Sequence, residues 1–144
     1  MPKDYPDHHD AELVLRLYDL RREALLRDSR TAMNTWMPKS FDDVVAVTKP
    51  DHPHNAAFRQ VTGYWEMVFG MARHGVIHPD FLMENSGEGL FFFARMEPFV
   101  AQLREMTSPR AYMNAEWVSK ETETGRALMT TFRARLEKMR AAAS

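Results

Sequence analysis

Cysteine is absent from the 144 residues of this sequence, and neither sign of charge is in excess. The lack of cysteine excludes disulfides, thiolate nucleophiles and cysteine-bound zinc or iron–sulfur sites. It is also compatible with a reducing cytoplasm. Nineteen Lys and Arg residues against 20 Asp and Glu residues give a net charge of −1. A charge this small provides no field that would draw the whole molecule to nucleic acid or to an anionic membrane.

The sequence also has no long hydrophobic run. Its most apolar stretch, Gly89–Ala94, is far shorter than the roughly 20 residues that cross a bilayer. The N-terminal residues include acidic and histidine side chains where a signal peptide would need an apolar core. We therefore expect a soluble, cytoplasmic protein of bacterial type, with neither a membrane nor nucleic acid as its partner.

A chain of this length with 44% hydrophobic and 11% aromatic residues is typical of one folded domain. At this size about two-thirds of the unfolded surface is buried on folding. No internal repeat or low-complexity segment divides the chain. We predict a single domain over residues 1–144, with flexible ends at residues 1–9 and 141–144.

The stretch Ala56–Gly75 is apolar on most sides of a helix with 3.6 residues per turn. Only one of its rows of side chains, which runs from Arg59 to Arg73, is plainly polar. A helix of this kind in a soluble protein has neighbours on most of its sides. The sequence therefore predicts an all-α, single-domain bundle of five to seven unequal helices around this central helix.

Flanking patterns predict the other helices. An amphipathic stripe begins near Asp10 and continues until Pro38 stops it. A short helix is expected over residues 41–47, because no second strand exists to pair with the β-branched residues there. Pro98 is expected to kink or split a later apolar helix. The last helix is expected from about Lys120.

Three residues of the central helix have specific predicted roles. Trp65 is predicted to be buried against the first and fifth helices. Gly63 and Gly70 are predicted to mark a close crossing with a neighbour, because a glycine inside a helix costs up to about 1 kcal/mol relative to alanine. On that reasoning Gly63→Ala would destabilise the fold through a steric clash.

Glu66 is the best candidate for a functional acid. It lies on the polar row of the central helix, two turns from both Arg59 and Arg73. A carboxylate on a largely buried helix has its pKa raised unless it is paired. Two interpretations stay open. The first is a general acid or ligand-anchoring group in an aromatic pocket, and the second is an inter-helix salt bridge to Arg95 or Arg104.

Other patterns assign no catalytic, cofactor or metal residue. The chain has six histidines but neither Glu-x-x-His nor His-Glu-x-x-His, and no serine lies in a Gly-x-Ser-x-Gly turn. A zinc site built from distant histidines stays open, because spacing alone does not test it. We interpret Gly-Glu-Gly at residues 87–89 as a helix break, since its acid would repel phosphate. The arginines of the first and last helices are interleaved with acids, which favours solvated faces over a DNA-binding helix.

The run Leu90–Phe93 supplies a candidate interface. Helical periodicity places Phe91 on a row with Arg95 and Glu105, which ought to face water. An exposed phenylalanine beside other apolar side chains often marks a contact surface. We therefore predict a homodimer whose self-complementary patch includes Phe91. The alternative is that Pro98 bends the helix and turns Phe91 inward.

Residues Gly63–Arg104 contain an aromatic-Glu pair at residues 65–66, a glycine turn at Gly75 and an Ile-x-x-Asp-x-Leu step over residues 77–82. This part of the chain resembles an uncharacterised bacterial family of all-helical proteins, domain of unknown function 4760. The likeness covers under a third of the sequence. It implies an all-α fold and assigns no activity.

Composition and motifs together do not specify an activity. The leading interpretation is a non-enzymatic, soluble helical protein that acts through association, with itself or with a protein partner. The alternative is a small-molecule-binding or metal-dependent helical bundle with its site near Glu66 and the aromatic side chains. A third hypothesis is a DNA-associated regulator. No cofactor is expected.

Overall fold

Every regular element in the computed structural model, which describes residues 3–143, is a helix. The elements are α1 (His8–Arg21), α2 (Ala24–Thr35), α3 (Phe41–Val47), α4 (Asn55–Arg73), α5 (Pro79–Asn85), α6 (Gly87–Met96), the 3-10 helix η1 (Glu97–Phe99), α7 (Val100–Met106), α8 (Met113–Glu121) and α9 (Glu123–Ala142). The all-α class predicted from the sequence is confirmed. Within the described residues, none of these helices is long and apolar enough to cross a membrane.

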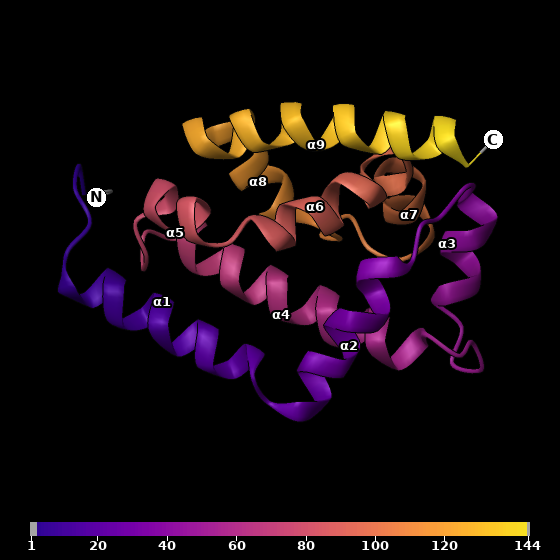
Figure 1. Cartoon of the computed structure of the whole chain (residues 1–144), viewed down its shortest axis with the longest axis horizontal. Helices are drawn as coiled ribbons and strands as arrows, with labels where there is room; N and C mark the ends of the chain where they lie inside the picture. Colours follow the sequence, from indigo (N-terminus) through magenta and orange to yellow (C-terminus); the bar gives the residue numbers. More distant parts are fainter. Residues whose placement is uncertain (1–2, 144) are drawn as a thin grey trace.

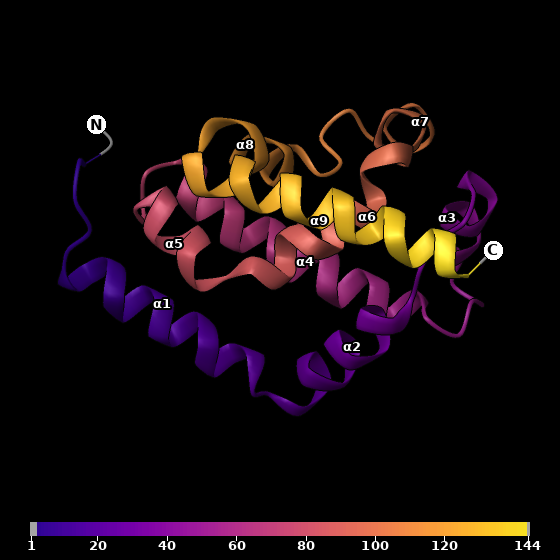
Figure 2. The same cartoon turned by 45° about the horizontal axis from the view of Figure 1, so that its top comes forward.

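Helix α4 occupies the centre of the molecule. In both views it lies between α1 and α2 on one side and α6, α8 and α9 on the other (Figure 1, Figure 2). Trp65 on this helix is 3% exposed, and its ring lies against Arg21 of α1 and Gly89 of α6. The predicted central helix is therefore confirmed, and so is the burial of its tryptophan. Its buried side chains are Asn55, Phe58, Val61, Tyr64, Trp65, Val68, Phe69 and Ala72.

Two of the expected long helices are divided, so residues 3–143 contain nine α-helices rather than five to seven. The first is interrupted before Glu23, whose carboxylate accepts hydrogen bonds from the backbone N–H groups of Leu25 and Leu26 and thereby caps α2. Pro98 divides the later stripe into α6, η1 and α7, because a proline has no N–H to continue the helix.

Of the two glycine crossings predicted on α4, the structure has the one at Gly70 and lacks the one at Gly63 within the described residues. An added Cβ at Gly63 would meet no atom of the described residues within 4 Å, so the predicted crossing there is wrong. At Gly70 such a Cβ would lie 2.9 Å from the amide of Asn114 in α8. At Gly89 of α6 an added Cβ would lie 2.5 Å from the Trp65 ring, so α6 packs closely on α4 there. Gly89 thus lies inside a helix, and the predicted break is confined to the residue before α6.

Asp10 ties the start of the chain to α5. Its side chain is 0% exposed, and one oxygen accepts a hydrogen bond from the His78 backbone N–H at 2.8 Å. The other accepts from the Asp7 backbone N–H and from Lys3 Nζ, each at 2.8 Å. Asp7 caps α1 in return, which completes a capping box. These contacts involve part of the N-terminal segment expected to be flexible, and residues 1–2 and 144 lie outside the described residues.

We predict that Asp10 makes the fold sensitive to acid. Burial acts to raise its pKa, but hydrogen bonds from Lys3 and from two backbone N–H groups lower it overall, from 3.8 to about 2. Because the pKa is lower in the folded state, the stabilisation is present above pH 3.8 and is lost as the pH falls towards 2. It amounts to about 2 kcal/mol. In urea denaturation, the free energy of unfolding should fall more between about pH 4 and pH 2 for wild type than for Asp10→Asn. An equal fall in both proteins would contradict this prediction.

Candidate functional site

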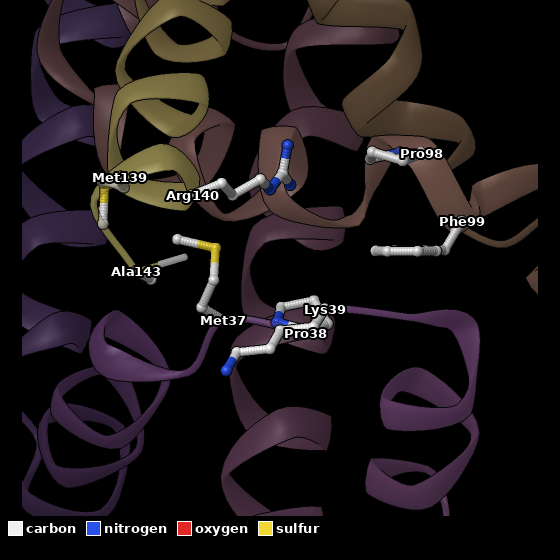
Figure 3. Close-up of a pocket in the computed structure, with 8 residues that line it drawn as sticks. All are labelled: Met37, Pro38, Lys39, Pro98, Phe99, Met139, Arg140 and Ala143. Carbon is white, nitrogen blue, oxygen red and sulfur yellow. The ribbon is translucent and has the colours of Figure 1, made fainter.

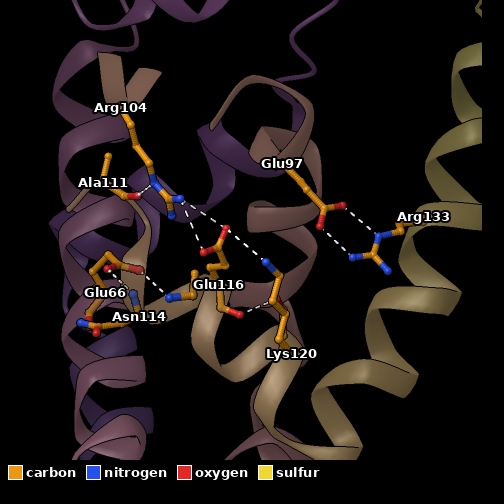
Figure 4. A network of polar contacts seen from close by, with 10 residues as sticks. Glu66, Glu97, Arg104, Ala111, Asn114, Glu116, Lys120 and Arg133 are labelled. Carbon is orange, nitrogen blue, oxygen red and sulfur yellow. Dashed lines mark hydrogen bonds and ion pairs between the residues drawn. The ribbon is translucent and has the colours of Figure 1, made fainter. Parts of the chain in front are cut away.

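Glu66, in the middle of α4, caps the N-terminus of α8. Its Oε1 accepts a hydrogen bond from the Ala115 backbone N–H at 2.8 Å, and its Oε2 accepts one from the Asn114 backbone N–H at 3.1 Å (Figure 4). Tyr112, which precedes α8, has a left-handed φ of 57° and makes no side-chain cap of its own. The carboxylate from α4 therefore takes the place of an N-cap side chain.

Neither arginine considered from the sequence pairs with Glu66. Arg104 donates from Nε to the Ala111 carbonyl at 2.9 Å and from Nη1 to the carboxylate of Glu116 (Figure 4). Arg95 points to the end of α2 instead. Burial raises the pKa of Glu66, while its two backbone N–H donors and the charges of nearby arginines act in the opposite direction. The crevice beside Glu66 leaves about 0 Å³ for a water-sized molecule, so it has no room for a ligand.

Glu66→Gln is expected to lower the free energy of unfolding by about 1–2 kcal/mol. The amide oxygen can accept from one backbone N–H, but the NH₂ group then faces the other donor. Urea denaturation measures the loss. Glu116→Gln is the matched control, because among residues 3–143 this 35% exposed carboxylate contacts side-chain cations alone, at 3.4 and 3.7 Å, and should matter less. Equal, small losses in both variants would show that Glu66 does not cap α8.

The prediction that Phe91 faces water is wrong. Helix α9 packs over α6, and the ring centroid of Phe91 lies 5.1 Å from that of Phe132 in an edge-on contact. The guanidinium groups of Arg95 and Arg135 each lie 5.3 Å from the Phe91 ring centroid. The ring is therefore turned to an internal neighbour, as the alternative interpretation held, but α9 provides the cover.

Arg95 is a buried cation that orders the end of α2. It is 1% exposed and donates from Nη1 to the carbonyl oxygens of Met33 and Trp36. Carbonyl groups at a helix C-terminus favour a cation because of the helix dipole. Burial lowers the pKa of Arg95 to about 10, and its Nε and Nη2 find no acceptor in the described part of the chain. Arg95 thereby holds the start of the linker between α2 and α3.

A surface groove forms where this linker, η1 and the end of α9 meet. It has a volume of about 560 Å³. Figure 3 shows the Met37 and Phe99 side chains entering from opposite sides, with Arg140 reaching towards the space between them. We call it the methionine groove, and its walls are Met37, Pro38 and Lys39 from the linker, Pro98 and Phe99 from η1, and Met139, Arg140 and Ala143 from the end of α9.

The methionine groove combines apolar surface with positive charge. Met139 is 43% exposed, and methionine adapts to ligands of varied shape because its side chain is flexible and polarisable. Lys39 and Arg140 bring two cations to the walls. None of the described lining residues carries a carboxylate, imidazole or hydroxyl side chain. The lining therefore suits the binding of an apolar anion better than acid–base chemistry.

A second groove lies between the α1–α2 corner and α4, with a volume of about 440 Å³. Leu20 and Met67 are 50% and 47% exposed there. The open space over Gly63 belongs to this surface, which explains why no internal helix fills it. We call it the glycine groove, and its lining includes Leu20, Glu23, Leu26, Arg59, Gly63 and Met67.

Residues 6–122 match the model of a protein family described as Domain of unknown function (DUF4760). The chain belongs to this family. The matched range contains α1 to α8 and confirms the resemblance noted between Gly63 and Arg104. In this DUF4760 protein α9 follows the matched range, so one wall of the methionine groove lies outside it. No curated protein and no solved structure matches the chain.

Histidines do not converge in the described part of this DUF4760 protein. Among residues 3–143, no three His, Cys, Asp or Glu side chains lie together as ligands for a metal ion. His78 has a structural role, since its Nδ1 accepts a hydrogen bond from the Phe81 backbone N–H at 3.2 Å and caps α5. The zinc site considered from the sequence therefore has no support among these residues.

Proposed function

We propose that this DUF4760 protein is a non-enzymatic protein that acts through association, and that its methionine groove binds an apolar, acidic segment of a partner protein. The lining of the groove carries this proposal, because it sets Met37, Phe99 and Met139 beside Lys39 and Arg140. Methionine-lined grooves accept amphipathic helices. The cations favour a partner whose apolar side chains are flanked by carboxylates.

The same lining supports binding over catalysis. A catalytic site needs an acid, base or nucleophile placed against a substrate. The carboxylate considered for such a role, Glu66, is engaged by backbone N–H groups and lies beside a crevice without free volume. The absence of cysteine supports a reducing compartment, and we propose the cytoplasm as the location of the protein.

Fluorescence anisotropy with a labelled amphipathic peptide tests the groove. The peptide repeats pairs of Leu and Glu, and a second version has Lys in place of every Glu. The acidic peptide should bind saturably, and the basic one should bind at least tenfold more weakly. Met139→Glu should weaken binding of the acidic peptide at least tenfold. Met106→Glu is the matched control, since both methionines are 43% exposed and only Met139 lines the groove.

Two outcomes would overturn the protein-partner proposal. Equal binding of the peptide to both methionine variants would mean that the groove is not its site. One-to-one binding of dodecanoate, without binding of the peptide, would assign the groove to a small apolar anion. The groove volume of about 560 Å³ lies within the range of small-molecule sites. Dodecanoate and the peptide should therefore be compared directly.

Self-association is part of the same proposal, and we place the homodimer at the glycine groove. The aromatic side chain first considered for it is covered by α9. The glycine groove has exposed Leu20 and Met67 and leaves room over Gly63 for a helix of a second copy. It also carries one acid, Glu23, and one base, Arg59. A two-fold axis can therefore set the acid of each protomer opposite the base of the other.

Light scattering at micromolar concentration measures the oligomeric state. Wild type is expected to be a dimer, and Met67→Glu a folded monomer, because the substituted side chain is 47% exposed and lines the groove. Met106→Glu, 43% exposed and elsewhere on the surface, should remain a dimer. A monomeric wild-type protein would contradict self-association and leave the methionine groove untouched.

A further inference from the structure

Four arginines converge at the corner between α1 and α2. They surround a pocket of about 300 Å³ together with Tyr18, and no carboxylate lines it among the described residues. The sequence favours solvated faces for these arginines, but Arg21 and Arg30 are only 12% and 19% exposed. We call this site the arginine pocket, and its lining residues are Tyr18, Arg21, Arg22, Arg27 and Arg30.

One carboxylate serves two of these guanidinium groups. Glu88 of α6 accepts hydrogen bonds from Nε and Nη2 of Arg30 at 2.7 and 2.9 Å. Arg21 Nη2 stays 3.8 Å from the same carboxylate, beyond hydrogen-bond length. Burial acts to raise the pKa of Glu88, but Arg30 lowers it overall, so this acid is ionised and fully engaged. Arg21 therefore has no hydrogen-bonded carboxylate among the described residues.

The Arg21 side chain is largely buried, and two of its donor nitrogens are unused within the described residues. Its guanidinium stacks on the rings of Tyr18 and Trp65, at 4.4 and 5.3 Å from their centroids. Its Nε and Nη1 are buried and have no acceptor within the described residues. A desolvated cation with unused donors is costly unless a nearby anion compensates its charge. The pocket beside it is open at the rim, where Arg22 and Arg27 are exposed.

We propose that the arginine pocket binds a small organic phosphate. Guanidinium groups bind phosphate in a bidentate manner and keep their charge at every physiological pH. A dianion matches a pocket of four guanidinium groups, because the partly buried Glu88 carboxylate contacts only Arg21 and Arg30 among them, and Asp19 lies 3.9 Å from the exposed Arg22. The volume of about 300 Å³ admits a phosphate with a small organic group, at the lower end of the range for small-molecule sites. This site is separate from the methionine groove and does not depend on the function proposed for it.

Isothermal titration with glycerol 3-phosphate tests the site, with acetate as the monoanion probe. One molecule should bind per chain, and acetate should not bind measurably. Arg27→Gln should weaken binding tenfold or more, since the loss of a charge-assisted hydrogen bond costs about that factor. Arg27 is exposed, so this variant is expected to fold. Arg16→Gln is the control, because it removes the same charge from an exposed site on α1 outside the pocket.

Three results would overturn the proposal. They are no saturable binding at millimolar glycerol 3-phosphate, equal weakening by Arg16→Gln and Arg27→Gln, and tighter binding of duplex DNA that Arg27→Gln abolishes. The last result would assign the arginines to a nucleic acid. Met139→Glu should leave phosphate affinity unchanged within twofold, so failure of the methionine groove and failure of the arginine pocket are distinguishable.

Discussion

Trp65→Ala is expected to lower the free energy of unfolding by about 3–5 kcal/mol. Trp65 is 3% exposed at the centre of α4, and its ring stacks on Phe69 with centroids 5.7 Å apart. It also supports the Arg21 guanidinium and contacts α6 at Gly89. Removing the indole leaves a cavity among three helices, and the rigid neighbours cannot close it.

Urea denaturation followed by circular dichroism measures this loss without depending on tryptophan fluorescence. Trp117→Ala is the matched control, because Trp117 is only partly buried on α8. We expect a clearly smaller loss for Trp117→Ala. A loss below about 1 kcal/mol for Trp65→Ala would contradict the central position of α4.

Gly89→Ala is expected to cost about 2–3 kcal/mol, in spite of the higher helix propensity of alanine. The added methyl group would lie 2.5 Å from the Trp65 ring and 2.7 Å from the Phe69 ring. Both rings are buried, at 3% and 0% exposure, so neither can move aside without displacing α6 from α4. Thermal and urea denaturation should therefore show a lower stability for Gly89→Ala than for wild type.

Gly63→Ala is the matched control for this clash. Nothing among the described residues lies within 4 Å of an added Cβ at Gly63, so the alanine should stabilise the monomer by up to about 1 kcal/mol through helix propensity. The measurement belongs at a protein concentration where the chain is monomeric. If Gly63→Ala destabilised the monomer as much as Gly89→Ala, the conclusion that Gly63 faces open space would be contradicted.

Local patterns in the sequence are sufficient for the central helix and for the break at Pro98, although they miss the division between α1 and α2. The apolar rows of Ala56–Gly75 indicate a helix surrounded by others, and α4 over Asn55–Arg73 is that helix. Pro98 predicts a break that the structure has at η1. Both features follow from periodicity and backbone chemistry within one segment, and no distant residue is needed to infer them.

Tertiary partners could not be inferred in the same way. Glu66 was open to a ligand or an arginine, and its actual partners are backbone N–H groups 48 and 49 residues away. Buried charges such as Asp10 and Arg95 contradict the statistical expectation that charged side chains lie outside. Phe91 was placed in water by the periodicity of its own helix, and only the packing of α9 over α6 reverses that.

The arginine pocket also arises from tertiary structure. Its residues come from α1, α2 and the corner between them at Arg22, and the sequence shows only an arginine-rich stretch. The sequence contains one weak signal for this corner. Glu23 precedes a new apolar stripe, and an acid at that position can cap the start of a second helix. The corner, more than the number of arginines, makes a site for an anion.

Methyl NMR of the methionines, during titration with the acidic amphipathic peptide, tests the proposed association most directly. Two of the 11 methionines, Met37 and Met139, line the methionine groove. Met67 lines the glycine groove, and Met106 lies on neither surface. We predict saturable shifts of the Met37 and Met139 methyl signals, while those of Met67 and Met106 stay in place. Unchanged Met37 and Met139 signals at saturating peptide, or shifts confined to Met67, would contradict the proposal that the methionine groove binds a protein partner.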